Sequence, residues 1–94
     1  MEVSVSFLGS VAENIGIKEE KVELKKNTCL EDLIKVLAEK HNSVFEGLDK
    51  DKKPLVSKGL IFMVNGRSIY LLEGVKTRLT DGSQITIVPV YAGG

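Results

Sequence analysis

A single amphipathic helix constrains the fold of this 94-residue chain more than any other feature. Apolar residues recur at intervals of three and four between Leu30 and Ala38, which puts them on one stripe of a helix. Thr28 and Glu31 have the spacing of a capping box, so we expect the helix to begin at Thr28. The stripe must be buried against another element, and we expect that element to be a sheet.

The segments around this helix predict strands. Residues 2–7 and 21–24 alternate between apolar and polar side chains, and a connection over residues 9–16, with a short helical turn in it, would join them as a hairpin. Residues 60–64 form an apolar run that meets Asn65-Gly66, the pair that most favours a tight type I′ turn, so two further strands follow, the second near Ile69. Asp81-Gly82 predicts a turn, and the final strand begins near Gln84.

This order of elements is the β-grasp arrangement known from ubiquitin. We therefore expect an α+β fold in which one main helix covers a mixed sheet of four to five strands. The first and last strands would pair in parallel at its centre, and Pro89, which has no N–H to donate, would mark where pairing stops. We expect one domain over residues 1–90, with a turn over residues 44–48 and a charged loop over residues 49–54, and a flexible tail over residues 91–94.

Charge and cysteine content exclude several classes of function. Thirteen basic and thirteen acidic side chains cancel, and no block of positive charge is present, so we expect no nucleic-acid partner. No apolar stretch approaches the ~20 residues that span a bilayer, so we expect a cytoplasmic protein with no membrane role. Cys29 is the only cysteine, which excludes an internal disulfide and a multi-cysteine zinc site, and we expect no metal.

Within the chain, residues suited to catalysis are sparse. Cys29 would lie at a helix N-terminus, where the dipole can raise thiol reactivity, although a packed small side chain is the simpler interpretation. His41 lies in the last helical turn, where its role would be to complement the dipole. The sequence has no phosphate loop or nucleophile elbow. We therefore expect a protein that is not itself an enzyme.

The carboxyl end is the more distinctive candidate. Tyr91 and Ala92 lead into Gly93 and Gly94, and glycine has no Cβ, so such a tail can enter a channel too narrow for side chains. Its one distinctive chemical group is the Gly94 carboxylate, which is ionised and unreactive at neutral pH until another protein activates it. A frayed chain end is the alternative interpretation.

Residues 79–94 resemble the closing segment of the MoaD/ThiS family of ubiquitin-like sulfur carriers. The shared pattern is Leu-x-Asp-Gly, a hydrophobic strand, a proline and a terminal Gly-Gly. Residues 3–7, the helix from Thr28 and the segment 64–66 fall where MoaD-like proteins have comparable pieces, so the resemblance extends over most of the chain.

The resemblance implies a function for the tail. An E1-like (MoeB-type) enzyme would use ATP to adenylate Gly94, and sulfur would then convert it to a thiocarboxylate, with no cofactor bound by the chain itself. In the MoaD branch the tail enters a MoaE-like large subunit and donates sulfur in molybdenum cofactor biosynthesis. Residues 91–94, fully extended, reach roughly 13 Å, which permits that insertion. The docking surface for the partner would comprise Phe7, Val88, Pro89 and Val90.

Other functions share the same first step. As in archaeal small modifiers of this fold, activated Gly94 would be joined to lysines of target proteins. The same carrier chemistry would also serve tRNA thiolation or thiamine synthesis. A plain interaction domain, for which Gly94 is dispensable, is the remaining alternative. The carrier and the modifier differ only in what captures the acyl group, which is sulfide in one case and a lysine amine in the other.

Overall fold

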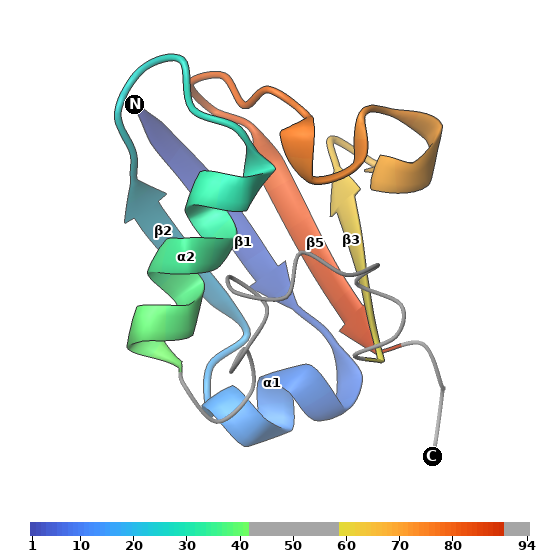
Figure 1. Ribbon diagram of the computed structural model, residues 1–94. Coiled ribbons are helices and arrows are strands. Elements are labelled where there is room, and N and C mark those ends of the chain that lie inside the picture. Colours follow the sequence, from blue (N-terminus) through green and yellow to red (C-terminus); the bar gives the residue numbers. More distant parts are fainter. Residues whose placement is uncertain (42–58, 90–94) are drawn as a thin grey trace.

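The computed structural model describes residues 1–41 and 59–89, which form a five-stranded mixed sheet with one face covered by helix α2 (Figure 1). The strand order is β2-β1-β5-β3-β4. The strands are β1 (Glu2–Phe7), β2 (Glu19–Glu23), β3 (Leu60–Val64), β4 (Arg67–Ser68) and β5 (Gln84–Pro89). The helices are α1 (Gly9–Ile15) and α2 (Leu30–Lys40), and the 3₁₀ turns are η2 (Ile69–Leu71) and η3 (Gly74–Lys76).

The two chain-terminal strands lie at the centre of the sheet. β1 and β5 run parallel in a register that pairs Ser4 with Gln84 and Phe7 with Ile87. β2 pairs antiparallel with the other side of β1, and β3 pairs antiparallel with the other side of β5. This topology confirms the predicted β-grasp fold.

The Asn65-Gly66 pair forms the predicted hairpin turn between β3 and β4. Both residues have positive φ angles, 51° and 83°, as a type I′ turn requires. The strand after the turn is shorter than expected, because β4 ends at Ser68 and Ile69 begins η2, where its side chain is buried.

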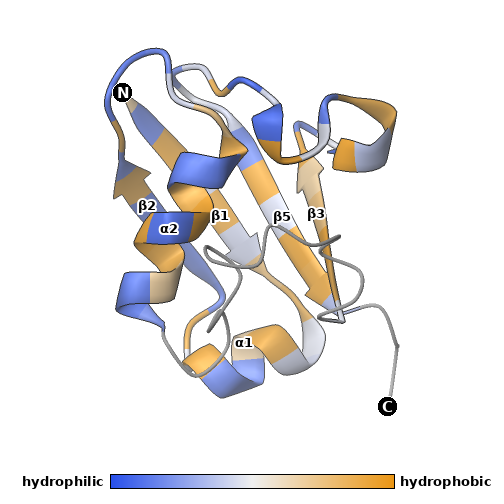
Figure 2. Ribbon diagram, in the orientation of Figure 1, coloured by the Kyte–Doolittle hydropathy of each residue, from blue (hydrophilic) through white to orange (hydrophobic). Residues whose placement is uncertain are grey.

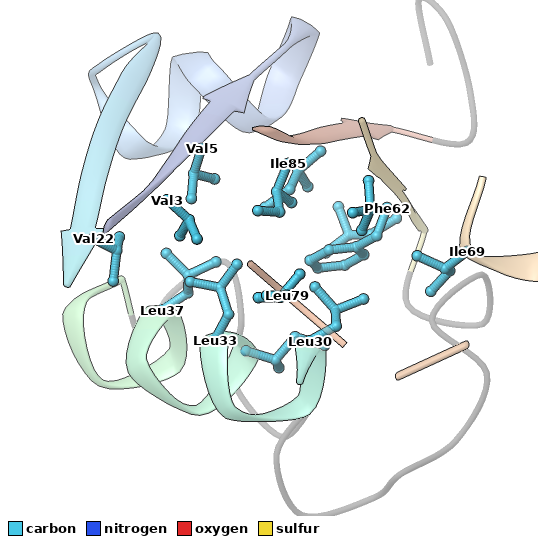
Figure 3. Packing of buried hydrophobic residues seen from close by; sticks show 14 of the residues in the cluster. Val3, Val5, Val22, Leu30, Leu33, Leu37, Phe62, Ile69, Leu79 and Ile85 are labelled. Carbon is cyan, nitrogen blue, oxygen red and sulfur yellow. The ribbon is translucent and has the colours of Figure 1, made fainter. Parts of the chain in front are cut away.

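Helix α2 buries the stripe that the sequence predicts (Figure 2). Figure 3 shows its leucines pointing at side chains from the sheet, with Leu33 and Leu37 directed at Val3, Val5 and Ile85. Removing such packed side chains costs about 2–5 kcal/mol each, so this layer supplies much of the stability. The buried residues of the helix are Leu30, Leu33, Ile34, Leu37 and Ala38.

The start of α2 differs from the sequence-based prediction by one residue. The N-cap is Cys29, and the Asp32 carboxylate accepts its backbone N–H at 2.9 Å, so the capping pair is Cys29 and Asp32, not Thr28 and Glu31. The cause is a tertiary bridge between Cys29 and Arg78, which holds Cys29 in an extended conformation. Thr28 instead donates its hydroxyl to the carbonyl of Lys25 at 3.0 Å.

The connection after β1 contains more helix than one turn. α1 is a seven-residue helix that buries Val11 and ends at Gly16, whose φ of 91° is the left-handed conformation favoured by glycine. Figure 1 places α1 at the end of the sheet where β1 and β5 finish. It closes that end of the core.

Three predictions lie outside the described residues. They concern the turn over residues 44–48, the charged loop over residues 49–54 and the tail over residues 91–94, so the proposed domain boundary at residue 90 also stays a prediction. In the part of the chain that is described, neither helix combines the length and apolar character that crossing a membrane requires.

Candidate functional site

Pro89 ends the central pair of strands. Leu8 donates its N–H to the carbonyl of Ile87 at 3.0 Å, and the regular parallel pattern would next have residue 89 donate to the carbonyl of Leu8. Proline has no N–H, so this bond cannot form. The Leu8 carbonyl instead accepts the N–H of Val11, at 3.2 Å, in the first turn of α1. The end of β5 and the start of α1 are therefore set by the same residue.

Gly9 packs against the ring of Pro89. Its φ is +55°, and a Cβ atom at this position would lie 3.1 Å from Cγ and 3.4 Å from Cδ of Pro89. Both the backbone conformation and the close approach favour glycine here. The contact fixes where α1 lies relative to the last described residue before the tail.

An apolar surface lies on the sheet face opposite α2, beside this exit. In the pairing of β3 with β5, Val88 lies opposite Ile61, and Thr86 lies opposite Met63. The residues between them, Ile87 and Phe62, point into the core. Val88, Ile61 and Met63 are half-buried, and Leu8, extended and next to Val88 by register, is 48% exposed. Figure 2 shows hydrophobic colour along β3 and toward the end of β5. We call these four residues, Leu8, Ile61, Met63 and Val88, the exit patch.

Some of the predicted docking residues lie at this patch, and one lies in the core. Val88 lies on the outer face as predicted, and Pro89 is half-buried at its edge. Phe7 was predicted as a docking residue, and this is wrong: it is 1% exposed, and its ring packs edge-on against His41 with ring centroids 5.9 Å apart. The alternation that puts Leu8 outward necessarily turns Phe7 inward. Val90 lies outside the described residues, as do Tyr91, Ala92, Gly93 and Gly94.

Three members of the exit patch, Leu8, Ile61 and Met63, were not predicted from the sequence. A signal was available in β3, where all five residues from Leu60 to Val64 are apolar. A strand with only one face on the core would alternate, so a continuous apolar run in this antiparallel strand indicates a second apolar face.

A cluster of polar side chains joins β2 to the end of α2. Glu20 of β2 contacts His41 Nε2 at 2.8 Å and Lys40 Nζ at 3.3 Å, which ties the end of α2 to the sheet. Burial raises the pKa of Glu20, but hydrogen bonds from His41 and Lys40 lower it, and the net direction is downward. The cluster stabilises a carboxylate and has the character of a structural clamp.

Cys29 has a structural position as the N-cap of α2. The hydrogen bond from its backbone N–H holds the pKa of Asp32 below the ordinary aspartate value, although burial opposes the shift. Across residues 1–41 and 59–89, no three His, Cys, Asp or Glu side chains gather in a way that could hold a metal ion.

Comparison with known proteins identifies a family. The model of the ThiS family matches residues 5–94. Small archaeal modifier protein 3 of Haloferax volcanii is 27% identical over an aligned length of 96 residues, gaps included, and the alignment covers all of this chain and all of that protein.

Solved structures share the fold. A solution structure of a Haloferax volcanii protein is 27% identical, with a TM-score of 0.80 over all of this chain and 87% of that one. A chain from the complex of subunits 1 and 2 of the molybdopterin-converting factor of Helicobacter pylori is 24% identical, with a TM-score of 0.61 over the whole of both chains. The fold of the described residues is therefore that of ubiquitin-like carriers and modifiers.

Proposed function

The chain belongs to the ThiS family, and from that premise we propose that it is a ubiquitin-like modifier joined through the Gly94 carboxylate to lysines of target proteins. The observation that carries the proposal is the full-length similarity to an archaeal small modifier protein. The position of Pro89 supports it, because β5 extends to Pro89, and only three residues separate Pro89 from the diglycine in the sequence.

The reaction needs an activating enzyme, because an α-carboxylate is ionised at neutral pH and is a poor acyl donor. The Gly94 carboxylate attacks the α-phosphorus of ATP held by an E1-like enzyme, pyrophosphate leaves, and a mixed anhydride with AMP forms. A lysine amine of the target then attacks the Gly94 carbonyl carbon, AMP leaves, and the nitrogen loses a proton as the amide forms. The chain contributes the acyl group and binds no cofactor of its own.

The folded body contributes recognition in this proposal. The exit patch offers the activating enzyme an apolar surface beside the point where the tail begins, and burial of such side chains favours association. Gly93 and Gly94 carry no side chains that would block a narrow channel toward the nucleotide. Docking at the patch would place the tail within reach of that channel.

Sulfur transfer is the second candidate function. The structural likeness to the Helicobacter pylori complex favours it, since that complex joins two subunits of a molybdopterin-converting factor. Sulfide would attack the same acyl adenylate and displace AMP, which leaves a thiocarboxylate at Gly94. As the small subunit of a molybdopterin synthase, the chain would insert this tail into a MoaE-like large subunit. A thiocarboxylate would serve tRNA thiolation or thiamine synthesis equally.

Mass spectrometry of the protein from its native cells separates the two candidates. Trypsin is unsuitable, because no Lys or Arg follows Arg78 and the whole segment 79–94 would stay on the modified lysine. Chymotrypsin cuts after Tyr91, so a modified lysine would carry the short remnant Ala-Gly-Gly. Such lysines on other proteins support the modifier.

Each other outcome has a clear meaning. A free tail in which sulfur replaces one oxygen of Gly94, with no modified lysines, supports the carrier instead. A variant lacking Gly94 serves as the control and should show neither product. If the intact chain also shows neither product, and cannot be adenylated by its activating enzyme with ATP, both candidates fail.

A further inference from the structure

A second surface feature lies at the opposite end of the sheet from Pro89. It is a hollow of about 450 Å³ beside the β3–β4 turn. Asn65, in that turn, donates its N–H to the carbonyl of Gln84 at the start of β5, at 2.7 Å. Pro89, the last described residue, lies about 17 Å further along the strand. The described residues that line it are Val64, Asn65, Arg67, Leu72, Thr77 and Arg78.

The backbone on both sides of the hollow is held by hydrogen bonds. Arg67 belongs to β4 and pairs with Val64 across the hairpin. Arg78 bridges to Cys29, and its neighbours form the flanking bonds, from Leu30 N–H to the carbonyl of Thr77 at 2.9 Å and from Leu79 N–H to the carbonyl of Thr28 at 3.0 Å. The two arginines are thus presented from fixed positions.

The hollow carries positive charge that nothing in the described structure neutralises. Arg67 and Arg78 are exposed, and neither guanidinium has an ion pair or hydrogen bond to any residue in 1–41 or 59–89. Among the described residues that line the hollow, none carries a carboxylate. Lys76, on the nearby η3, differs in having Glu31 as a partner at 2.8 Å.

The side-chain amide of Asn65 adds a donor. Its Oδ1 accepts the N–H of Gln84 at 2.9 Å, which orients the amide and leaves its NH₂ group without an acceptor among the described residues. The hydroxyl of Thr77 is already used, since it donates to the carbonyl of Gly74 at 2.7 Å and accepts the N–H of Glu73 at 3.1 Å. The available side-chain polar groups of the described lining residues are therefore donors.

Apolar side chains stand beside these donors. Leu72 lines the hollow, and Leu71 and Tyr70 on η2 are 79% and 55% exposed. A guanidinium can bind a carboxylate through two parallel hydrogen bonds. Exposed leucine and tyrosine side chains favour contact with an apolar side chain of the same ligand. A small inorganic anion would use only the donors and leave the apolar side chains in water.

We propose that this hollow docks an acidic segment of a partner protein. Carboxylates of the segment bind Arg67 and Arg78, and an adjacent apolar side chain packs against Leu71 and Leu72. The hollow shares no residue with the exit patch and lies at the other end of β5 from Pro89, so we expect a partner bound here to leave the Gly94 chemistry accessible. The proposed docking does not depend on whether sulfide or a lysine amine captures the acyl group of Gly94.

NMR titration of the full chain tests the proposal. The probe is the capped peptide acetyl-Glu-Asp-Leu-Glu-Asp-amide, and the comparison probes are acetyl-Gln-Asn-Leu-Gln-Asn-amide and inorganic phosphate. We expect amide shifts over residues 65–67, 71–72 and 78 with the acidic peptide, weakening as salt is added. The double variant Arg67→Gln, Arg78→Gln should lower the affinity about tenfold or more.

A charge-matched control uses the far edge of the sheet. Lys18→Gln with Lys21→Gln removes the same charge near β2 and should leave binding unchanged, as should deletion of Gly94. The proposal is overturned if the lysine variant weakens binding as much as the arginine variant, which would indicate unspecific attraction. It is also overturned if phosphate or the neutral peptide produces the same shifts at the same concentration, or if millimolar acidic peptide produces none.

Discussion

Gly9 and Pro89 are in contact at the point where the two central strands of the sheet separate. Because Pro89 cannot donate to Leu8, the Leu8 carbonyl is left for Val11, and α1 begins there. The close approach of Gly9 then holds the start of α1 against the proline ring. The end of β5 and the start of α1 therefore depend on each other.

Gly9→Ala should destabilise the protein by about 2 kcal/mol, because it adds a crowded Cβ to a left-handed backbone position. Gly16→Ala is the control, since Gly16 is also left-handed but has open space around its Cβ position, and it should cost about 1 kcal/mol. Urea unfolding of each variant measures both values. Pro89→Ala should reduce the cost of Gly9→Ala, and equal costs in the two backgrounds would contradict the proposed contact.

Asp32→Ala should cost about 1 kcal/mol, because it removes the acceptor of the Cys29 N–H at the start of α2. Glu31→Ala should cost less, because the carboxylate that binds the N-cap N–H belongs to Asp32, while Glu31 pairs with the exposed Lys76. Thermal unfolding followed by circular dichroism ranks the two variants. The reverse ranking would support the capping pair that the sequence alone suggests.

Glu20→Gln should destabilise the protein at neutral pH, by about 1 kcal/mol, because it weakens the bonds to His41 and Lys40. The pKa of Glu20 is lowered in the folded state. Its stabilising contribution is therefore fully present above the unfolded pKa, about 4.3, and is lost as the pH falls through the folded value. The difference between wild type and variant should shrink below about pH 4.

Urea unfolding at several pH values from about 3 to about 7 measures the difference in unfolding free energy between wild type and Glu20→Gln. This interval includes the pH range in which carboxylates titrate. Glu19→Gln is the control, because Glu19 is exposed and its side chain has no partner among the described residues. The control should show a small effect at every pH. A Glu20 effect that grows toward acid would contradict the assigned direction of the shift.

Val88→Ser should weaken activation by the E1-like enzyme about tenfold in kcat/KM, because it removes apolar surface from the exit patch next to the tail. Ile61→Ser should act in the same way, since Ile61 pairs with Val88 across the strands. Ile17→Ser, which changes a 41% exposed apolar residue outside the sheet, should leave activation unchanged. ATP–pyrophosphate exchange measures the step directly. Equal exchange rates for Val88→Ser and wild type would contradict docking of the activating enzyme at the exit patch.

The periodic elements of this protein could be predicted because their signals are local. The α2 stripe, the alternation in β1 and the Asn65-Gly66 turn each depend on residues within one element. Together they specify the order of elements, and that order admits the β-grasp topology. The diglycine is likewise a property of the sequence itself.

The errors arose where a distant segment decides the local structure. The start of α2 moved to Leu30 because Thr77 and Arg78, far along the chain, bind the backbone around Cys29. His41 was interpreted from its own helix, whereas its partners, Glu20 and Phe7, come from β2 and β1.

The sequence by itself determined the order of the strands and the main helix, the buried stripe of α2, and that the chain carries a diglycine. Only the tertiary structure decided that Phe7 is core, that Leu8, Ile61, Met63 and Val88 form one surface, and that Arg67 and Arg78 share a hollow. The physical reason is that periodicity and turn preferences act between near neighbours in the chain. Contacts between strands depend on register and packing, which no single segment encodes.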